Sequence, residues 1–387
     1  MQAAVLSSAA IGGRALFAAA DENRSGSNSV PLAPPDRQPP KLAVPEPSTK
    51  KVGFAIVGLG QLALEEVMPA FAQSHLAKPV ALVSGHPDKA RKVAETYGIA
   101  PDAIYDYEGY DKLAGDPRVQ AIYIILPNSM HAEYTIRGLR AGKHVLCEKP
   151  MAASVEESER MIAAAKETGR KLMVAYRLHY DPMHRRVMEL CEKQALGKVV
   201  LFESSNCQDV AAPNIRLSAA LGGGPVGDVG VYSINAARYC IREEPVEVTA
   251  FAQQPKDDPR FREVPESVVF TLRYPSGALA YCGCSFGTTE SRRFRVLCAK
   301  GFIEMEPAFS YRGLQLRVKR GDPEKGDAEK AAQLIEPVDQ FAAEMDHFSE
   351  CILKDTEPRT PGALGLADMK IMAAIHEAAK TQQAVKM

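Results

Sequence analysis

A glycine-rich turn, Gly58-Leu59-Gly60-Gln61-Leu62-Ala63, lies between a short apolar run at residues 54–57 and a segment of helical spacing at residues 62–72. In a dinucleotide-binding turn the first glycine permits a tight bend, the second lets a pyrophosphate approach the backbone, and a small third residue permits close helix–strand packing. The N-terminus of the next helix adds N–H groups and a positive dipole for the phosphates. We therefore predict a dinucleotide cofactor that contacts Gly58, Leu59, Gly60, Gln61 and Leu62.

The end of the next strand distinguishes NAD from NADP. An acidic residue there would hold a ribose 2′-hydroxyl and select NAD. Residues 83–86 read Val-Ser-Gly-His and contain no carboxylate, whereas a hydroxyl, free backbone N–H groups and a nearby lysine can surround a 2′-phosphate. Lys89 has an alternative role as one of several solvated helix charges. We predict NADP, bound in this region by Ser84, Gly85, His86 and Lys89.

Polar residues also follow two later apolar strands. Leu126-Pro127-Asn128, with His131 one turn later, closes one strand, and Glu148-Lys149-Pro150 closes the other. Because ligands of open α/β sheets lie outside the carboxyl ends of the strands, these groups are expected to converge on one cleft. For Lys149 the structural alternative is an ion pair with Glu148. The predicted cofactor contacts here are Leu126, Pro127, Asn128, His131, Glu148 and Lys149.

The second half of the chain contributes two further clusters. Residues 176–182, Tyr-Arg-Leu-His-Tyr-Asp-Pro, lie between a strand and a helix, and Arg177 among them is a predicted cofactor contact. Residues 222–232 form a glycine-rich turn that leads into a helix, with Asp228 and Tyr232 one helical turn apart on one face. Glycines this dense indicate the close approach of a ligand or another backbone. The alternative role for Asp228 is a helix N-cap.

The elements that position these groups alternate between strand and helix in the first half of the chain. Apolar runs at 54–57, 79–84, 121–126 and 144–147 alternate with helical spacing at 62–72, 87–97 and 130–141. Near-continuous apolar strands between helices indicate a parallel sheet that is covered on both faces. This pattern predicts an α/β fold with an N-terminal Rossmann domain.

After about residue 196 the hydrophobic period changes to two. Residues 246–250 and 314–318 alternate between apolar and polar, and turn sequences occur at 274–277 and 299–301. Helices are expected at 181–193, 340–353 and 364–381. We predict a C-terminal α+β domain with a large, mainly antiparallel open sheet. The expected divisions are a tail and arm at 1–50, the NADP-binding domain at 51–170, and a sugar-binding and oligomerisation domain at 171–387. The last helices of the chain can pack back on the NADP-binding domain.

The composition is that of a globular enzyme. Of the 387 residues, 46% are hydrophobic and 25% charged, and this length favours two domains. A formal net charge of −1 gives no bulk attraction to nucleic acid or to an anionic membrane. No stretch approaches the roughly 20 apolar residues of a membrane span. The eight cysteines are scattered, so we predict no metal site and interpret them as buried free thiols.

The first fifty residues differ from the rest. A run of small apolar residues ends in Ala18-Ala19-Ala20 before Asp21, which resembles an export cleavage site, although no basic cluster precedes it. A periplasmic protein with an export signal and a cytoplasmic protein with a disordered tail both stay open. Residues 31–48 carry seven prolines, which favour an extended arm. The arm is either a linker or a segment that lies along a partner subunit or over the cofactor.

Several of these segments resemble one enzyme family. The runs at 53–60, 123–129, 148–151 and 180–183 and the turn at 222–232 are similar to the glucose–fructose oxidoreductase and inositol dehydrogenase family, and most of all to its glucose–fructose oxidoreductase branch. The resemblance implies tightly held NADP, oxidation of one sugar at C1 to a lactone, and reduction of a second sugar to an alditol. It also implies an arm that encloses the cofactor, export with the cofactor bound, and a homodimer or homotetramer formed through the open sheet.

The resemblance also assigns roles by position. Tyr180 is the expected proton-transfer residue, Lys149 is its partner, and Asp228 and Tyr232 line the sugar site. A histidine replaces Tyr232 in the polyol dehydrogenases of the family, so the tyrosine favours the sugar-oxidising branch. Residues 207–220 depart from glucose–fructose oxidoreductases in length and content. Because this stretch borders the substrate site, the second sugar can be a ketose or an aldose.

The proposed chemistry needs a tyrosine that works as a base. A phenol with an ordinary pKa near 10 is a poor base at neutral pH, but a neighbouring ammonium and an oxidised nicotinamide stabilise the phenolate. Two other functions stay open: an ordinary NADP-dependent sugar or polyol dehydrogenase that releases NADPH, and a cofactor-bound sensor or binding protein. The joint presence of Lys149, Tyr180 and Asp228 speaks against the sensor.

Overall fold

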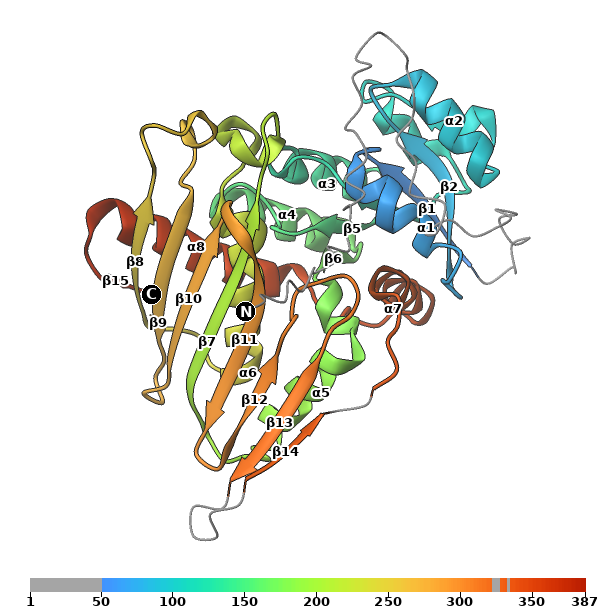
Figure 1. The fold of residues 1–387 in the computed structure, drawn as a ribbon. Helices are drawn as coiled ribbons and strands as arrows, with labels where there is room; N and C mark the ends of the chain where they lie inside the picture. Colours follow the sequence, from blue (N-terminus) through green and yellow to red (C-terminus); the bar gives the residue numbers. More distant parts are fainter. Residues whose placement is uncertain (1–50, 322–327, 333–334) are drawn as a thin grey trace, which may run out of the picture.

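The computed structural model describes residues 51–321, 328–332 and 335–387. The predictions made for the tail, the export site and the proline-rich arm therefore lie outside the described residues. The described chain forms two sheets with their covering helices (Figure 1). The site is built where the carboxyl ends of the first sheet meet the second sheet.

The first sheet has six parallel strands in the order β3-β2-β1-β4-β5-β6. Every residue of β1 and of β4 is buried, because helices cover both faces of this sheet. The strand order reverses between β1 and β4, which is where an open α/β sheet forms its ligand crevice. The predicted Rossmann domain is confirmed. Its strands are β1 (Val52–Val57), β2 (Ala77–Val83), β3 (Ile104–Tyr105), β4 (Ala121–Ile124), β5 (His144–Glu148) and β6 (Leu172–Ala175).

The helices predicted at 87–97 and 130–141 are observed, the one near the glycine-rich turn differs, and the helix at 155–168 was not predicted. The helix predicted at 62–72 is a π-helical turn, η2 (Ala63–Val67), continued by the short α1 (Met68–Ala70). The strand predicted at 121–126 ends at Ile124, ahead of Pro127, which has no N–H to donate. The other helices are α2 (Pro87–Tyr97), α3 (His131–Arg140) and α4 (Val155–Thr168), with short 3₁₀ turns η3 (Pro101–Ala103), η4 (Tyr110–Gly115) and η5 (Asn128–Met130).

The second sheet has nine strands in the order β14-β13-β12-β11-β7-β10-β9-β8-β15. All of its neighbouring strands are antiparallel except β7 and β10, which agrees with the predicted open, mainly antiparallel sheet. Its strands are β7 (Val199–Asp209), β8 (Glu247–Gln253), β9 (Ser267–Arg273), β10 (Leu279–Ser285), β11 (Gly287–Cys298), β12 (Gly301–Met305), β13 (Leu316–Gly321), β14 (Ala328–Ala332) and β15 (Val385–Lys386).

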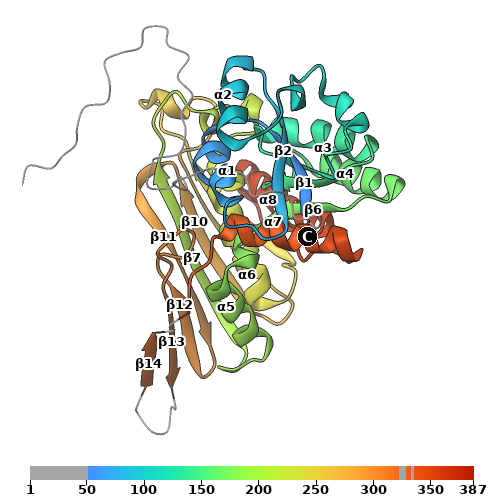
Figure 2. The ribbon, with the colours of Figure 1, turned by 90° about the vertical axis from the view of Figure 1, so that its right-hand side faces the viewer.

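Helices α5 (Pro182–Glu192) and α6 (Val231–Ile241) lie on one side of this sheet, and its other side is open (Figure 2). The alternation of buried and exposed residues along β9 and β10 follows from this arrangement. The turns predicted at 274–277 and 299–301 join β9 to β10 and β11 to β12. Short helical turns η6 (Arg177–Tyr180), η7 (Ile215–Leu217), η8 (Ala219–Leu221), η9 (Val226–Gly230) and η10 (Pro259–Phe261) complete the domain.

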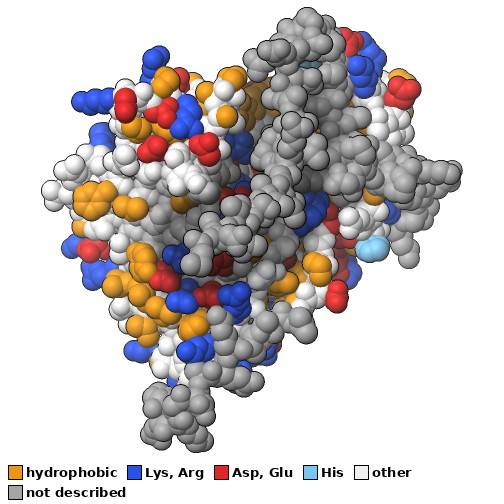
Figure 3. Space-filling view, in the orientation of Figure 1, with side chains coloured by type: hydrophobic (Ala, Val, Ile, Leu, Met, Phe, Trp, Pro, Cys, Tyr) orange, Lys and Arg blue, Asp and Glu red, His pale blue; other side chains and the backbone are white. Residues whose placement is uncertain are grey.

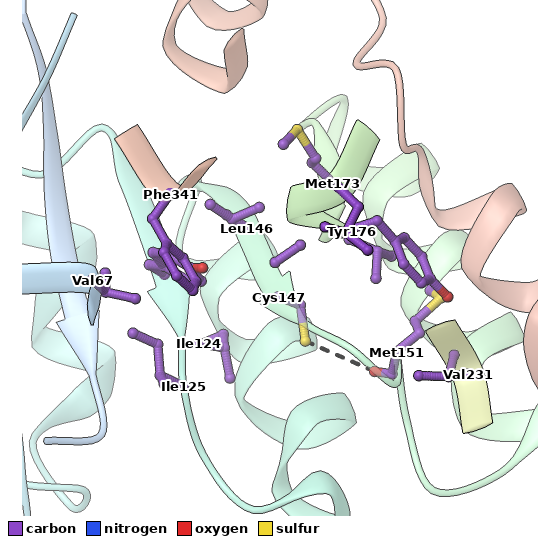
Figure 4. Packing of buried hydrophobic residues seen from close by; sticks show 14 of the residues in the cluster. Val67, Ile124, Ile125, Leu146, Cys147, Met151, Met173, Tyr176, Val231 and Phe341 are labelled. Atoms are coloured by element: carbon purple, nitrogen blue, oxygen red, sulfur yellow. Dashed lines mark hydrogen bonds between the residues drawn. The ribbon is translucent and has the colours of Figure 1, made fainter. Parts of the chain in front are cut away.

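The C-terminal helices α7 (Gln340–Lys354) and α8 (Gly362–Thr381) join the two halves of the molecule. The Phe348 ring of α7 lies 6.3 Å from the Phe54 ring of β1, and the Asp346 carboxylate accepts bonds from the Ser74 hydroxyl at 2.5 Å and from the Leu76 N–H at 2.8 Å. One buried cluster therefore spans both sheets. Figure 4 shows Phe341 of α7 near Ile124 and Ile125 of the first domain, and Val231 of α6 near Met151.

The eight cysteines all lie among the described residues. All eight cysteines are free thiols, and six of them are buried, as predicted. No group of three or more potential metal ligands occurs among residues 51–321 and 335–387. Within the same ranges no helix is both long and apolar enough to cross a membrane.

Candidate active site

A cleft of about 830 Å³ lies between the two sheets and collects almost all of the predicted site residues. This volume is within the usual range of small-molecule sites, about 300–1,000 Å³. Loops at the carboxyl ends of the first sheet form one wall. The other wall comes from β7, the glycine-rich turn at 222–232 and an aromatic group at residues 309–311. Of the predicted site residues, only Gly85 and Tyr180 are missing from its lining.

The glycine-rich turn at the first strand has the geometry that a pyrophosphate needs. Gly58 has a φ of +95°, and a Cβ there would lie 2.3 Å from the Ile125 carbonyl oxygen, so only glycine fits. A Cβ on Gly60 would meet nothing within 4 Å, so the backbone at that position stays accessible from the cleft. Leu59, Gln61 and Leu62 line the same end. These residues fit a dinucleotide.

The end of β2 presents a hydroxyl and an ammonium to the cleft. Ser84 Oγ accepts a hydrogen bond from the His86 N–H at 3.1 Å, and Lys89 Nζ donates to the Leu59 carbonyl at 3.3 Å. Lys89 therefore bends over the glycine-rich turn and does not project into solvent with its helix neighbours. Gly85 packs against the ring of Tyr107, which lines the cleft and was not predicted. This cationic surface suits a 2′-phosphate.

Asn128 and His131 hold the loops around the cleft in place. Asn128 Nδ2 donates to the Gly222 carbonyl at 2.8 Å, which joins the first domain to the second glycine-rich turn. The His131 ring is fully buried between the carbonyls of Leu126, at 2.9 Å, and Pro150, at 2.8 Å. Burial lowers the pKa of His131, so the neutral ring donates to one of them. His131 thus links the exits of β4 and β5.

Glu148 is buried and is held by a phenol. Its Oε1 accepts a bond from the Tyr123 hydroxyl at 2.8 Å, and its Oε2 accepts one from the Lys149 backbone N–H at 3.3 Å. A second buried carboxyl, Glu344 of α7, lies 3.4 Å from the same hydroxyl. Burial raises the pKa of both carboxyl groups. The alternative of a Glu148–Lys149 ion pair is not observed.

The ammonium of Lys149 is paired with Asp228. Lys149 Nζ donates to the Asp228 carbonyl at 2.8 Å and to its Oδ1 at 3.2 Å, and it lies 4.7 Å from the centroid of the Tyr232 ring. Burial opposes the charge of Lys149, but Tyr232, Asp228 and Glu148 raise its pKa overall. The side chain is only 10% exposed. The site therefore holds a charged lysine against a phenol ring.

Asp228 lies in the π-helical turn η9 and does not cap a helix, contrary to the alternative considered for it. Its Oδ2 accepts bonds from Arg216 Nε at 2.6 Å and from Gln208 Nε2 at 3.2 Å. Burial disfavours its ionisation, yet the two cations Lys149 and Arg216 hold its pKa at about 2. Asp228 is therefore an ionised carboxylate between two cations.

Arg177 supports the aromatic wall. Its guanidinium lies 5.1 Å from the Tyr232 ring centroid and 4.5 Å from that of Tyr311, and it donates to the Phe309 carbonyl at 2.6 Å. The side chain of Gln340 accepts a further bond from it. Arg177 thus fixes two phenols at the edge of the cleft. Burial raises the pKa of Tyr311 to about 12.

Tyr180, the predicted proton-transfer residue, lies away from the cleft. Its hydroxyl bonds to Thr360 Oγ1 at 2.9 Å, its ring is 5.0 Å from the His347 ring, and burial raises the pKa of its phenol. The prediction failed because most polar residues of segment 176–182 have structural partners: Asp181 caps α5, and His179 bonds to Asn235 at 2.7 Å. Only Arg177 of this segment lines the cleft.

Several cleft residues were not predicted from the sequence. They share no motif, because they come from several strands, helical turns and loops spread along the chain. Arg216 does lie in the stretch that departs from the resembled branch, so sequence divergence next to the substrate site was a usable signal. The main additional lining residues are Glu66, Tyr107, Asn206, Gln208, Arg216, Arg292, Phe309, Tyr311 and Phe341.

Two family models match the chain. Residues 52–176 match an oxidoreductase family with an NAD-binding Rossmann fold, and residues 184–304 match the GFO/IDH/MocA C-terminal domain. These two segments contain most of the residues that line the cleft. The match therefore covers the dinucleotide end and the Lys149–Asp228–Tyr232 end together.

Several known proteins with similar sequences or structures act on sugars. The chain is 32% identical to a D-xylose 1-dehydrogenase [NADP(+)] of Haloarcula marismortui over 87% of this chain and 93% of the relative. The structure is similar to that of an aldose-aldose oxidoreductase from Caulobacter crescentus complexed with glycerol, with a TM-score of 0.83, 42% identity, and coverage of 87% of this chain and 100% of the other. A 3-ketoreductase of Actinomadura kijaniata, in complex with NADP and TDP-benzene, has a TM-score of 0.75 and 26% identity, with 85% and 98% coverage.

Proposed function

The chain belongs to the GFO/IDH/MocA family of oxidoreductases, and we propose that it is an NADP-dependent enzyme that oxidises an aldose at C1 and returns the hydride to a second sugar. The observation that carries this proposal is the Lys149 ammonium 4.7 Å from the Tyr232 ring centroid, in the same cleft as the glycine-rich turn at 58–63. NADP as the cofactor is supported by the carboxylate-free end of β2 and by the NADP-dependent relatives.

The dinucleotide would be held by the turns at the carboxyl ends of β1, β2, β4 and β5. Gly58 and Gly60 let the pyrophosphate approach, and Ser84 and Lys89 face the 2′-phosphate. Bound NADP supplies a ring that accepts a hydride from the sugar and later returns it. The residues of this chain supply position, charge and a proton path.

In the oxidation, the C1 hydroxyl of the aldose gives its proton to Tyr232 while its C1 hydrogen leaves as hydride, and the sugar becomes a lactone. The Lys149 ammonium stabilises the Tyr232 phenolate that must be present at the start. Asp228 fixes the position of that ammonium by two contacts, at its carbonyl and its Oδ1. The buried Arg177 keeps Tyr232 and Tyr311 at the cleft edge.

In the reduction, the same groups act in the opposite direction. A second sugar places its carbonyl oxygen next to Tyr232, receives the hydride at carbon and the phenol proton at oxygen, and leaves as an alditol. Tyr232 is again a phenolate, so the cycle needs no external acid or base. We thus assign to Tyr232 the role that the sequence resemblance had given to Tyr180.

One experiment tests the closed cycle against an ordinary dehydrogenase, which the similarity to D-xylose 1-dehydrogenases favours as the second candidate. The protein is purified, and its absorbance spectrum is recorded before and after an aldose is added without free cofactor. A nicotinamide band that appears on the protein supports the closed cycle. A protein that arrives empty and reduces added NADP supports the ordinary dehydrogenase, and no response in either form contradicts both.

We also propose that the open face of the nine-stranded sheet joins copies of the chain. Phe251, Val269 and Tyr281 are 66%, 54% and 47% exposed there, around a shallow hollow of about 280 Å³. Figure 3 shows hydrophobic side chains gathered over β8 to β10. An apolar surface of this kind on a soluble enzyme usually marks an interface. Light scattering of Val269→Lys against the parent tests this: a variant that stays at the parent's mass contradicts the assignment.

A further inference from the structure

Arg216 occupies a loop that has no assigned role in the site. It belongs to the strap, residues 210–224, which runs from the end of β7 to η9 along the cleft. The Asn128 amide bonds to the Gly222 carbonyl at one end of the strap. At the other end, Arg260 donates to Asp209 at 2.7 Å and to the Val210 carbonyl at 3.2 Å.

The glycines of the strap hold the backbone of Arg216 in place. The Gly224 N–H donates to the Arg216 carbonyl at 2.9 Å. A Cβ on Gly223 would lie 2.4 Å from the same oxygen, so a side chain at that position would displace it. The glycine-rich turn that was predicted from the sequence therefore fixes the place of one arginine. The backbone of Arg216 is thus held within the strap, and the side chain lines the cleft.

The side chain of Arg216 reaches Asp228 and competes with Lys149 for it. Arg216 Nε donates to Asp228 Oδ2 at 2.6 Å, while Lys149 Nζ donates to Oδ1 at 3.2 Å. The shorter contact belongs to the arginine. The charges in this group sum to +1, because two cations share one carboxylate. A lysine that shares its counter-ion retains more of its field for a nearby phenolate than one that holds the carboxylate alone.

We propose that Arg216 is a positioning residue: by holding Asp228 Oδ2 it limits the pairing between Asp228 and Lys149, so that the Lys149 ammonium stabilises the Tyr232 phenolate. This role rests on the proposed function of Tyr232. Around Lys149 and Tyr232, the charged and titratable groups of the surrounding elements are Glu148, Arg177, Arg216, Asp228 and Tyr311. Of the three cations Lys149, Arg177 and Arg216, only Arg216 belongs to the strap.

The test compares Arg216→Met with Arg216→Lys and with Arg260→Met. Arg216→Met removes the charge, and because the side chain is 39% exposed, it removes little packing. Arg216→Lys keeps the charge at the same place. Arg260→Met is the matched control, because it loosens the strap at its other end and leaves Asp228 with both cations. Thermal unfolding checks that each variant folds.

Loss of one positive charge near the phenolate should move the acid limb of the pH profile for sugar oxidation upward by about one unit. For Arg216→Met we expect this shift, a fall in kcat of about tenfold at neutral pH, and a KM within a few-fold of the parent's. In Arg216→Lys the acid limb should lie at the parent's pH, and in Arg260→Met it should not move. An unmoved limb in Arg216→Met, or an equal shift in Arg260→Met, would overturn the proposal, as would a change confined to KM.

A second readout does not need turnover. The tyrosinate absorbance of each protein is titrated with pH and compared with that of its Tyr232→Phe partner, so that the difference reports Tyr232 alone. The transition should move to higher pH in Arg216→Met and not in Arg260→Met. If the parent oxidises no sugar, the proposed function fails. The titration then still decides the role of Arg216, and a transition that stays at the parent's pH in Arg216→Met contradicts it.

Discussion

Replacing Tyr232 by phenylalanine removes the proton path and keeps the ring that packs beside Lys149 and Arg177. The contacts at 4.7 and 5.1 Å are made to the ring, which phenylalanine keeps, so the fold should be retained although the hydroxyl's hydrogen bond to Arg177 is lost. General acid–base catalysis contributes about 10²- to 10⁴-fold to a rate, and kcat for both oxidation and reduction should fall by that amount. One lost hydrogen bond to a sugar is worth about 0.5–1.5 kcal/mol, so KM should rise by no more than about tenfold.

Tyr180→Phe is the matched control for this experiment. Its hydroxyl bonds to Thr360 inside the protein, and its loss should lower stability by about 1 kcal/mol while kcat stays near that of the parent. Both variants are assayed by stopped-flow absorbance of the nicotinamide band after an aldose is added, and then after the second sugar. The reasoning fails if Tyr180→Phe abolishes turnover while Tyr232→Phe retains it.

Three further perturbations test other parts of the account. Ser84→Asp places a carboxylate opposite the 2′-phosphate, so NADP should dissociate at least tenfold more readily by equilibrium dialysis, and retention equal to that of Ser84→Ala would be evidence against this placement. Glu344 has a pKa well above that of an unfolded glutamate, so its contribution to stability is present at acidic pH and is lost as pH rises towards its folded pKa. Glu344→Gln should therefore gain melting temperature relative to the parent as pH increases, and a constant difference between pH 5 and 9 would contradict the burial argument. Asp346→Ala removes three hydrogen bonds between α7 and the first domain and should cost about 2–4 kcal/mol in urea unfolding, whereas a change below 1 kcal/mol would show that apolar packing alone docks α7.

The fold was predictable because its signals are local. Near-continuous apolar strands between helices indicated a parallel sheet, and alternating strands with Gly-containing turns indicated a large antiparallel one; the strand counts of six and nine came from the structure. The π-helical turn at Ala63–Val67 was not predicted, because it differs from an α-helix only in hydrogen-bond register and leaves the same hydrophobic pattern.

The site was predictable where its residues follow strands and was not where contacts depend on tertiary packing. Ser84, Asn128 and Lys149 lie in one cleft because the carboxyl ends of parallel strands share an edge. Tyr180 lies in the more polar stretch of sequence, yet its hydroxyl is buried against Thr360, whereas Tyr232 follows an apolar run and lines the cleft. Arg216 lies in a segment without a recognisable motif, so its hydrogen bond to Asp228 could be found only in the structure.

The most direct test of the proposed cycle follows the hydrogen at C1. An aldose deuterated at C1 is turned over with an unlabelled second sugar, in the presence of excess unlabelled NADPH in solution, and the alditol is analysed by mass spectrometry. If a bound cofactor passes the hydride between the two sugars, the alditol from the second sugar carries deuterium at its reduced carbon. An alditol without deuterium, with the label found in the free NADPH pool, would contradict the closed cycle and identify an ordinary dehydrogenase.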